Sequence, residues 1–350
     1  RLAWADARVP RLSFGGALTK VVFLARRLRH AWAGQEMVGI LLPPSVAGAL
    51  VNFAALLLGK VPVNLNYTLA EAALASCVRQ CKLQTVLTSQ AFLDRVKVKI
   101  PCRTLLLEEA AAQPRLGEKL GALALAWLAP AGALEKAVGR ERPGTLDDLA
   151  TVIFSSGSTG EPKGVMLTHY NIASNVEQLG QMFDFGPRDG ILGVLPFFHS
   201  FGFTATLMTP ALIGLRAVYH PNPLEAKPIG DLVRRYEATH LLATPTFLQL
   251  YLRSCDPADF GSLRVVMVGA EKLPERLARA FEEKFGVRPI EGYGCTECSP
   301  VVTANTREFR AAGFRQVGSR AGSIGRPLPG VSVRIVSPDT GQPLPLGQPG

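Results

Sequence analysis

Residues 151–169 read TVIFSSGSTGEPKGVMLTH, and this segment is the most informative one in the chain. A short β-branched and aromatic run leads into a loop rich in glycine and hydroxyl side chains, and we expect a helix to follow with Thr168 as its N-cap. Glycines let backbone N–H groups approach an anion, hydroxyl groups donate hydrogen bonds to it, and Lys163 adds positive charge. The segment therefore predicts a strand followed by a polyphosphate-binding loop in an α/β domain.

The loop is not the GxxxxGK[ST] loop of P-loop ATPases, because Pro162 stands where that loop has its second glycine. A generic Gly/Ser turn is the structural alternative, and it leaves the lysine and the four hydroxyl groups unexplained. The residues expected to contact phosphate are Ser155, Ser156, Gly157, Ser158, Thr159, Gly160 and Lys163.

Short β-rich runs alternate with helical patterns on both sides of this loop. We expect strands at 37–42, 61–65, 83–88, 103–107, 151–154, 191–195, 215–219, 240–243, 263–268 and 287–290. Helices are expected near 45–58, 69–80, 90–96, 168–182 and 274–285, with an earlier basic helix whose apolar face carries Leu18, Val21, Val22, Ala25, Leu28 and Trp32. Such alternation predicts an α/β fold with two doubly wound, mainly parallel sheets.

Three units are expected along the chain. Residues 1–150 form a first α/β subdomain that ends in an Ala/Leu/Pro-rich stretch, 108–148, which lacks periodicity and is interpreted as an insertion or a linker. Residues 151–321 form a second α/β subdomain. Residues 322–350 are rich in Gly and Pro and indicate the start of a small β unit.

Further polar motifs begin where predicted strands end: LPFFHSFG at 195–202, VGAEKL at 268–273 and EGYGCTE at 291–297. Because ligands bind at the carboxyl ends of strands in open parallel sheets, these loops should meet the phosphate loop in one crevice. The candidate residues on them are His199, Gly269, Ala270, Glu271, Gly292, Tyr293, Gly294, Thr296 and Glu297.

Composition limits the alternatives. The 350 residues are 47% hydrophobic and 19% charged, which excludes a disordered chain, and a net charge of +10 suits acidic partners. Aromatic residues do not alternate with the basic clusters, so we expect no nucleic-acid binding. Six cysteines fit a reducing compartment, and Cys295 and Cys298 lack the second ligand pair that a zinc site needs. With no signal peptide and no apolar run of about 20 residues, a cytoplasmic protein is expected.

The run FSSGSTGEPKGV at 154–165 resembles the phosphate loop of the adenylate-forming superfamily of acyl-CoA synthetases, luciferases and peptide-synthetase adenylation domains. The motifs above and GSIGRPLPG at 322–330 follow in that superfamily's order, which makes chance agreement an inadequate explanation. The resemblance implies the large N-terminal domain of an enzyme that joins a carboxylate to ATP as an acyl-adenylate, with Mg²⁺, and then passes the acyl group to a thiol.

The resemblance also implies roles for single residues. Thr159 and Lys163 would hold the β- and γ-phosphates, Thr296 would contact the α-phosphate, and Glu297 with Thr159 would hold Mg²⁺. Tyr293 would stack on adenine beside Gly269, Ala270 and Glu271, and His199 would lie near the substrate carboxylate.

The acid substrate is inferred from an absence of charge. Between Asp189 and Glu225 the sequence has no acidic residue that could pair with a substrate ammonium group, and the stretch FFHSFGFTATLMTPALIGL at 197–215 is apolar. We therefore expect a fatty acid, because each buried CH₂ contributes about 0.8 kcal/mol.

Within the superfamily the chain is similar to the synthetase half of bifunctional bacterial 2-acylglycerophosphoethanolamine acyltransferase/acyl-acyl-carrier-protein synthetase. The segments that carry this likeness are LPFFHSFGFT, ATPTFLQLYLR, DFGSLRVVMVGAEKLPE and EGYGCTECSPVV. The likeness implies acyl carrier protein as acceptor, phospholipid re-acylation, and contact with the inner face of the bacterial inner membrane. An acyl-CoA synthetase, with CoA as acceptor, and a non-catalytic nucleotide- or acyl-binding fragment are the alternatives.

Two features of the carboxyl-terminal part complete the expectations. The basic cluster at 307–326 is interpreted either as a solvated loop or as a surface that steers an acidic carrier protein or an anionic membrane. The chain begins at Arg1 and stops at Gly350, before the ribose-binding Asp, the hinge and the small C-terminal catalytic domain that the resemblance implies. We therefore expect a piece of a longer protein that forms adenylate slowly or not at all by itself.

Overall fold

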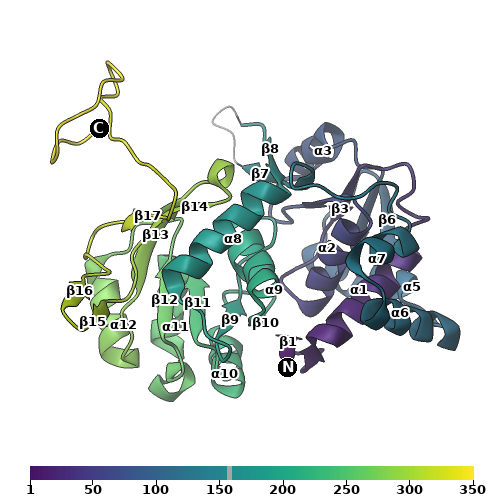
Figure 1. Ribbon diagram of the computed structural model, residues 1–350, viewed down its shortest axis with the longest axis horizontal. Coiled ribbons are helices and arrows are strands. Elements are labelled where there is room, and N and C mark those ends of the chain that lie inside the picture. Colours follow the sequence, from purple (N-terminus) through teal and green to yellow (C-terminus); the bar gives the residue numbers. More distant parts are fainter. Residues whose placement is uncertain (156–159) are drawn as a thin grey trace.

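The computed structural model describes residues 1–155 and 160–350, and two mainly parallel sheets wrapped by helices form its framework (Figure 1). The smaller sheet is fully parallel, in the order β4-β3-β5-β6. Its strands are β3 (Met37–Ile40), β4 (Val61–Asn64), β5 (Thr85–Thr88) and β6 (Arg103–Leu106).

The larger sheet has nine strands among the described residues, in the order β17-β14-β13-β12-β11-β9-β10-β1-β2. The strands from β13 to β1 run parallel, and the outer ones are antiparallel. They are β1 (Leu2–Ala5), β2 (Leu12–Ser13), β9 (Gly190–Gly193), β10 (Arg216–Tyr219), β11 (His240–Ala243), β12 (Val265–Val268), β13 (Ile290–Gly294), β14 (Val301–Ala304) and β17 (Arg326–Pro327). The expected fold class is confirmed.

Helices cover both sheets, and several begin at a hydroxyl side chain that accepts a backbone N–H of the first turn, as Ser13, Ser45 and Thr168 do. The helices are α1 (Phe14–Leu28), α2 (Val46–Leu57), α3 (Glu71–Gln80), α4 (Gln90–Val96), α5 (Leu107–Ala110), α6 (Leu116–Leu128), α7 (Ala131–Val138), α8 (His169–Phe183), α9 (Thr209–Ile213), α10 (Ala226–Tyr236), α11 (Pro245–Ser254) and α12 (Glu275–Phe285). Shorter helical turns are η1 (Gly202–Met208), η2 (Pro257–Phe260) and η3 (Thr296–Cys298).

Three sequence expectations need correction. The stretch 108–148, interpreted as an insertion or a linker without periodicity, is largely helical, because most of it forms α5, α6 and α7, which pack beside α1. The phosphate loop is followed by a strand before the helix: β7 (Leu149–Ser155) and β8 (Lys163–Thr168) form an antiparallel pair separate from the larger sheet. In the basic helix, Leu18 is exposed and Trp32 lies beyond the helix end, although it is fully buried.

The ends of the chain also differ from the expected division. β1 comes from the first 150 residues yet pairs with β10 in the larger sheet. Of residues 322–350, β17 joins the larger sheet through β14, and the rest contains an isolated bridge between Val336 and Pro343. This segment extends from the body of the molecule, as the yellow trace in Figure 1 shows.

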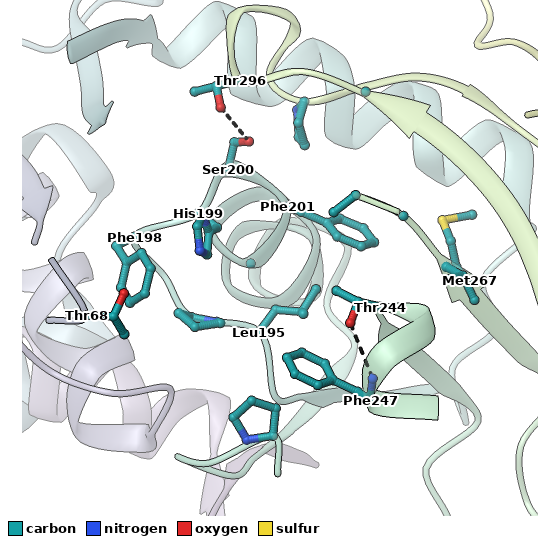
Figure 2. Close-up of a pocket in the computed structure, with 18 of the residues that line it drawn as sticks. Thr68, Leu195, Phe198, His199, Ser200, Phe201, Thr244, Phe247, Met267 and Thr296 are labelled. Atoms are coloured by element: carbon teal, nitrogen blue, oxygen red, sulfur yellow. Dashed lines mark hydrogen bonds between the residues drawn. The ribbon is translucent and has the colours of Figure 1, made fainter. Parts of the chain in front are cut away.

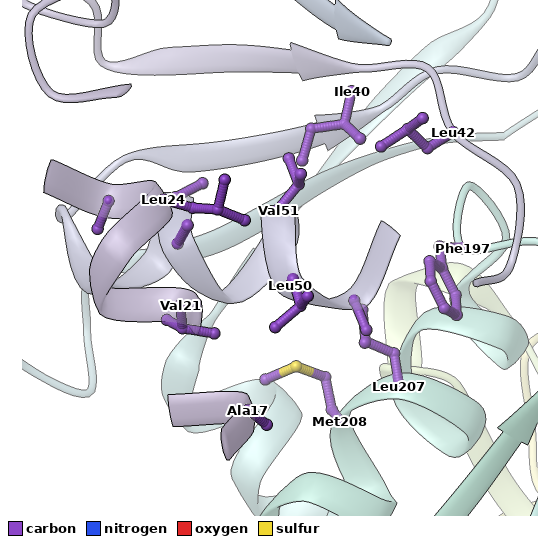
Figure 3. Close-up of a cluster of buried hydrophobic side chains, with 14 of the residues drawn as sticks. Ala17, Val21, Leu24, Ile40, Leu42, Leu50, Val51, Phe197, Leu207 and Met208 are labelled. Carbon is purple, nitrogen blue, oxygen red and sulfur yellow. The ribbon is translucent and has the colours of Figure 1, made fainter. Parts of the chain in front are cut away.

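The main hydrophobic core joins the two halves. Val21 and Leu24 of α1 and Leu50 of α2 pack in one cluster with Leu207 and Met208 of η1 (Figure 3). The π-helical segment η1 therefore anchors the larger sheet to the helices of the first half, which holds the two sheets in a defined relation around the loops between them.

A pH effect on stability follows from His240 at the start of β11. Burial lowers the pKa of this nearly inaccessible histidine to about 4, although Asp189 acts in the opposite direction. Because the unfolded chain takes up the proton near its ordinary pKa, the unfolded state binds more protons between about pH 6.5 and pH 4. The free energy of unfolding should therefore fall as the pH falls through this window.

Denaturant unfolding of the parent chain and the His240→Gln variant at pH 7 and pH 5 tests this effect. The variant should lose less stability than the parent between the two pH values, whatever the substitution costs at pH 7. Equal losses in both proteins would show that His240 does not carry the effect.

Candidate active site

A cavity of about 670 Å³ opens where the central strands of the larger sheet end (Figure 2). The loops after β9, β11 and β12, together with the end of β13, form most of its wall. The remaining wall comes from the loop after β10, from the start of β14, and from the other half of the molecule through residues after β4 and on α4. Its size is in the range of ligand sites, which is about 300–1,000 Å³.

Seven of the expected site residues line this cavity: His199, Gly269, Ala270, Gly292, Tyr293, Gly294 and Thr296. They come from the loops after β9 and β12 and from the end of β13 with η3 after it, and these lie at the same edge of the sheet. Residues almost 100 positions apart therefore meet there. Ala270 has a left-handed backbone with φ +67°, which a residue with a side chain seldom adopts. Such strain occurs at binding sites, where the surrounding structure holds it.

His199 lies on the cavity wall between the aromatic side chains of Phe198 and Phe201 (Figure 2). Its backbone N–H donates to the Pro196 carbonyl at 3.1 Å, and its own carbonyl accepts from Phe203 N–H at 2.8 Å. The ring is reachable from the cavity, yet the protein around it partly desolvates it and lowers its pKa. The neutral imidazole is therefore favoured, which leaves one ring nitrogen as a donor and the other as an acceptor.

A hydrogen bond links two of the converging loops. The hydroxyl groups of Ser200 and Thr296 lie 3.3 Å apart (Figure 2). This contact positions Thr296 beside the loop that carries His199, so the two candidate residues belong to one connected wall.

The phosphate loop approaches from the β7–β8 pair. Lys163 is the first residue of β8, lies opposite Ser155 in the register, and has an exposed side chain. Gln80 of α3 donates to the Pro162 carbonyl at 2.9 Å, and β8 contacts η3, which contains Thr296 and Glu297. Gly160 has φ +88°, a backbone that favours glycine. Ser156, Gly157, Ser158 and Thr159 lie outside the described residues.

Two expected acidic residues do not line the cavity. Glu271 accepts a hydrogen bond from Thr246 Oγ1 at 2.8 Å, which ties its carboxylate to the first turn of α11. Glu297 is exposed on η3, directly after Thr296. Lys163, Ser155 and Gly160 are likewise absent from the lining.

The expected apolar wall is only partly correct. Of the stretch 197–215, residues 198–202 line the cavity, whereas Phe203, Leu207 and Met208 are buried in the core that joins the halves. The π-helical turn of η1 directs these side chains away from the cavity.

The sequence motifs did not predict the lining residues that lie outside those motifs. Phe247 of α11 and Met267 of β12 lie near Leu195 and Phe201 (Figure 2). Tyr67 packs edge-to-face on Phe198 at 4.9 Å, and burial raises its pKa to about 12. The one available signal was that Tyr67 and Thr68 follow the end of a predicted strand.

The charge of the wall is also informative. Among the described residues that line the cavity none is Asp or Glu, and Arg95 of α4 is cationic. Arg95 forms an ion pair with Glu225 at 3.1 Å, and Glu225 also contacts His220 at 3.0 Å. This cavity therefore offers no carboxylate for a substrate ammonium group.

Comparison with known proteins gives a consistent result. A family model described as AMP-binding enzyme matches residues 3–350. A long-chain-fatty-acid–CoA ligase of Bacillus subtilis is 34% identical over 201 residues, which cover 56% of this chain and 34% of that protein. A probable 4-coumarate–CoA ligase 3 of Dictyostelium discoideum is 34% identical over 211 residues, or 58% of this chain and 36% of that protein.

Solved structures agree with the sequence relatives. ATP-bound MatB from Rhodopseudomonas palustris is similar with a TM-score of 0.79 and 25% identity, over 99% of this chain and 65% of that one. The matched part corresponds to about a third of the length of each curated relative and about two thirds of the solved chain. Because the family match runs through all the motifs whose loops meet at the cavity, the chain belongs to the family of AMP-binding enzymes.

Proposed function

We propose that this chain forms the ATP and fatty-acid sites of an enzyme that activates the acid as an acyl-adenylate for transfer to CoA. The observation that carries the proposal is the meeting of His199, Thr296 and Tyr293 in one cavity that has no acidic lining residue among those described. In the reaction a carboxylate oxygen attacks the α-phosphorus, and pyrophosphate leaves. The thiol of the acceptor then loses its proton and attacks the acyl carbonyl, and AMP leaves.

The nucleotide would occupy the side of the cavity formed by the β12 and β13 loops. Tyr293 is half exposed and offers a ring face to adenine, while Gly269 and Ala270 provide backbone next to it. Thr296 would contact the α-phosphate, and the β- and γ-phosphates would extend towards Lys163 and the loop before β8. Glu271 would act at the edge of the adenine site rather than inside the cavity.

Glu297 and, by resemblance, Thr159 are the residues proposed for Mg²⁺. The described residues contain no group of three His, Cys, Asp or Glu side chains that could hold a metal. One carboxylate and one hydroxyl group fit Mg²⁺ bound to a nucleotide, because this ion commonly uses one or two carboxylates together with phosphate oxygens and water. When bound, Mg²⁺ would offset phosphate charge.

The acid would occupy the apolar side, between Leu195, Phe201, Phe247 and Met267. Its carboxylate would lie at His199, whose neutral ring can donate one hydrogen bond without forming a strong ion pair. Each CH₂ that enters this region contributes about 0.8 kcal/mol. A fatty acid therefore fits better than an amino acid.

CoA is proposed as the acceptor because the B. subtilis relative is described as a long-chain-fatty-acid–CoA ligase. The expected acceptor was acyl carrier protein, with a role in phospholipid re-acylation, and nothing in the site favours it. Arg310 and Arg315 of the basic cluster both pair with Glu308, at 2.9 Å and 2.8 Å, so their charge is partly neutralised within the chain. Among the described residues, no helix is long and apolar enough to span a membrane.

ATP–pyrophosphate exchange with fatty acids of graded length tests the proposal, followed by thioester formation with CoA and with purified acyl carrier protein. Exchange should depend on a fatty acid and should not occur with amino acids, and CoA should be the better acceptor. Exchange with amino acids would contradict the substrate class. Because the 350-residue chain by itself is expected to form adenylate slowly or not at all, exchange is measured on the full-length protein. Nucleotide binding without exchange in that protein would favour the non-catalytic alternative.

A further inference from the structure

A second cavity, of about 710 Å³, lies between α1, α2, α5 and α6, and no described residue lines both this cavity and the candidate active site. Its walls are apolar and include Phe23, Leu24, Leu50, Leu120, Leu123 and Trp127. Figure 1 shows α1, α5 and α6 together at one end of the molecule, at the outer side of the first half. We call this cavity and the outer surface of α1 and α6 the α1–α6 face.

α6 is unusual because both of its sides are apolar. Ala122 is fully buried, and Leu125 and Ala126 pack against the core. The other side carries Leu116, Leu120, Leu123 and Trp127 at spacings of four, three and four residues, so they form one stripe along the helix. Their exposed fractions are 72%, 55%, 45% and 67%. A surface helix of a soluble protein normally carries polar side chains at such positions.

Trp127 is held in place although it is exposed. Its ring covers Gly15 of α1 so closely that a Cβ on Gly15 would overlap the ring. An indole fixed at the surface in this way presents an apolar body and one N–H donor, a combination that is enriched at membrane interfaces.

The charge of the α1–α6 face is positive. Lys20 and Lys119 are the charged residues among the described lining of the cavity, and α1 contains no acidic residue. The acid of α6, Glu118, pairs with Arg27 at 2.6 Å. The neighbouring acids of α5, Glu108 and Glu109, do not line the cavity, and the Glu108 carboxylate accepts a hydrogen bond from the backbone N–H of Gln90 at 3.4 Å.

We propose that the α1–α6 face binds the surface of an anionic lipid bilayer. The leucine stripe and Trp127 would enter the boundary between headgroups and acyl chains, while Lys20 and Lys119 would reach lipid phosphates from aliphatic stems that lie on the apolar surface. A surface that binds a folded protein normally carries more polar groups for hydrogen bonds than this face does. The inference does not rest on the proposed activity.

Tryptophan fluorescence gives a direct test, because the chain has three tryptophans and Trp4 and Trp32 are buried. Vesicles of phosphatidylglycerol and phosphatidylcholine added to the 350-residue chain should shift the emission to shorter wavelengths. Lipids brominated in the acyl chains should quench it. Trp127→Phe should remove both responses. Vesicles of phosphatidylcholine alone should bind at least about tenfold more weakly, since each lysine contributes about fivefold at an anionic surface.

Sedimentation with the same vesicles separates the two parts of the face. Leu120→Gln/Leu123→Gln and Lys20→Gln/Lys119→Gln should each weaken binding about tenfold or more. Lys97→Gln/Lys99→Gln and Leu346→Gln are matched controls at exposed positions elsewhere, and they should bind like the parent. Circular dichroism checks that each variant is folded.

Either of two results would overturn the proposal. The first is that vesicles neither shift nor quench the fluorescence emission of Trp127 in the unmodified chain. The second is that the stripe variant binds vesicles as well as the controls do. Concentration-dependent dimers that the stripe variant abolishes, without vesicle binding, would assign the face to a second copy instead. Because neither ATP nor an acid is present, failure here is distinct from failure of the proposed activity.

Discussion

Glu297→Gln should reduce Mg²⁺-dependent adenylate formation by about 10²–10³-fold, the loss typical when one stabilising group is removed from a transition state. The amide keeps the shape of the side chain and removes its charge, and an amide oxygen is a weaker ligand for a hard cation than a carboxylate. Glu297 is exposed on η3, so its replacement should leave the fold unchanged.

The measurement is the rate of fatty-acid-dependent pyrophosphate exchange by the full-length enzyme over a range of Mg²⁺ concentrations. Glu283→Gln is the matched control, because Glu283 is exposed on α12 and has no side-chain hydrogen bond or ion pair among the described residues. If the Glu297 variant kept the parent rate and the parent Mg²⁺ dependence, Glu297 would be an ordinary surface carboxylate.

Lys163→Ala should weaken ATP binding by about 1.5–3 kcal/mol, the contribution of a hydrogen bond to a charged group. The lysine begins β8 with its side chain in solvent, and its backbone pairing with Ser155 does not depend on the side chain. Fold stability should therefore change little, so the loss can be assigned to the phosphates. AMP, which lacks the β- and γ-phosphates, should bind the parent and the variant alike.

Calorimetric titration with ATP and with AMP makes this comparison, and Lys99→Ala serves as a control at an exposed lysine outside the cavity lining. Equal ATP affinities in the parent and the Lys163 variant would contradict the phosphate-loop interpretation. Equal losses for ATP and AMP would place the effect on the shape of the site rather than on phosphate charge.

Much of the fold could be predicted because its strands and helices have strong local signals. The strand at 240–243 and the helix ending before Gly286 were predicted with their observed bounds or close to them. The stretch 108–148 was not, because α6 is apolar on both sides and has no polar face to create a helical period. β8 was missed because it runs directly into the N-cap of α8, so its six residues were counted with the loop before the helix.

The candidate site, like the fold, was predicted only in part. Residues that follow a strand end in a recognisable motif, such as His199 and Thr296, were predicted and do line the cavity. Tyr67 and Arg95 were not, because their role depends on how the first half packs against the second. The role of each motif residue stays a prediction until the experiments above are done.

Local patterns and composition were enough to predict the alternation of strands and helices, the motifs at the strand ends, and the excess of positive charge. They could not show which side chains face one another across the cavity, that Phe203, Leu207 and Met208 belong to the core, or that the stripe on α6 faces water. The reason is physical: burial and charge pairing depend on which surfaces the packed chain brings together, and apolar residues have the same local pattern whether a neighbour covers them or not.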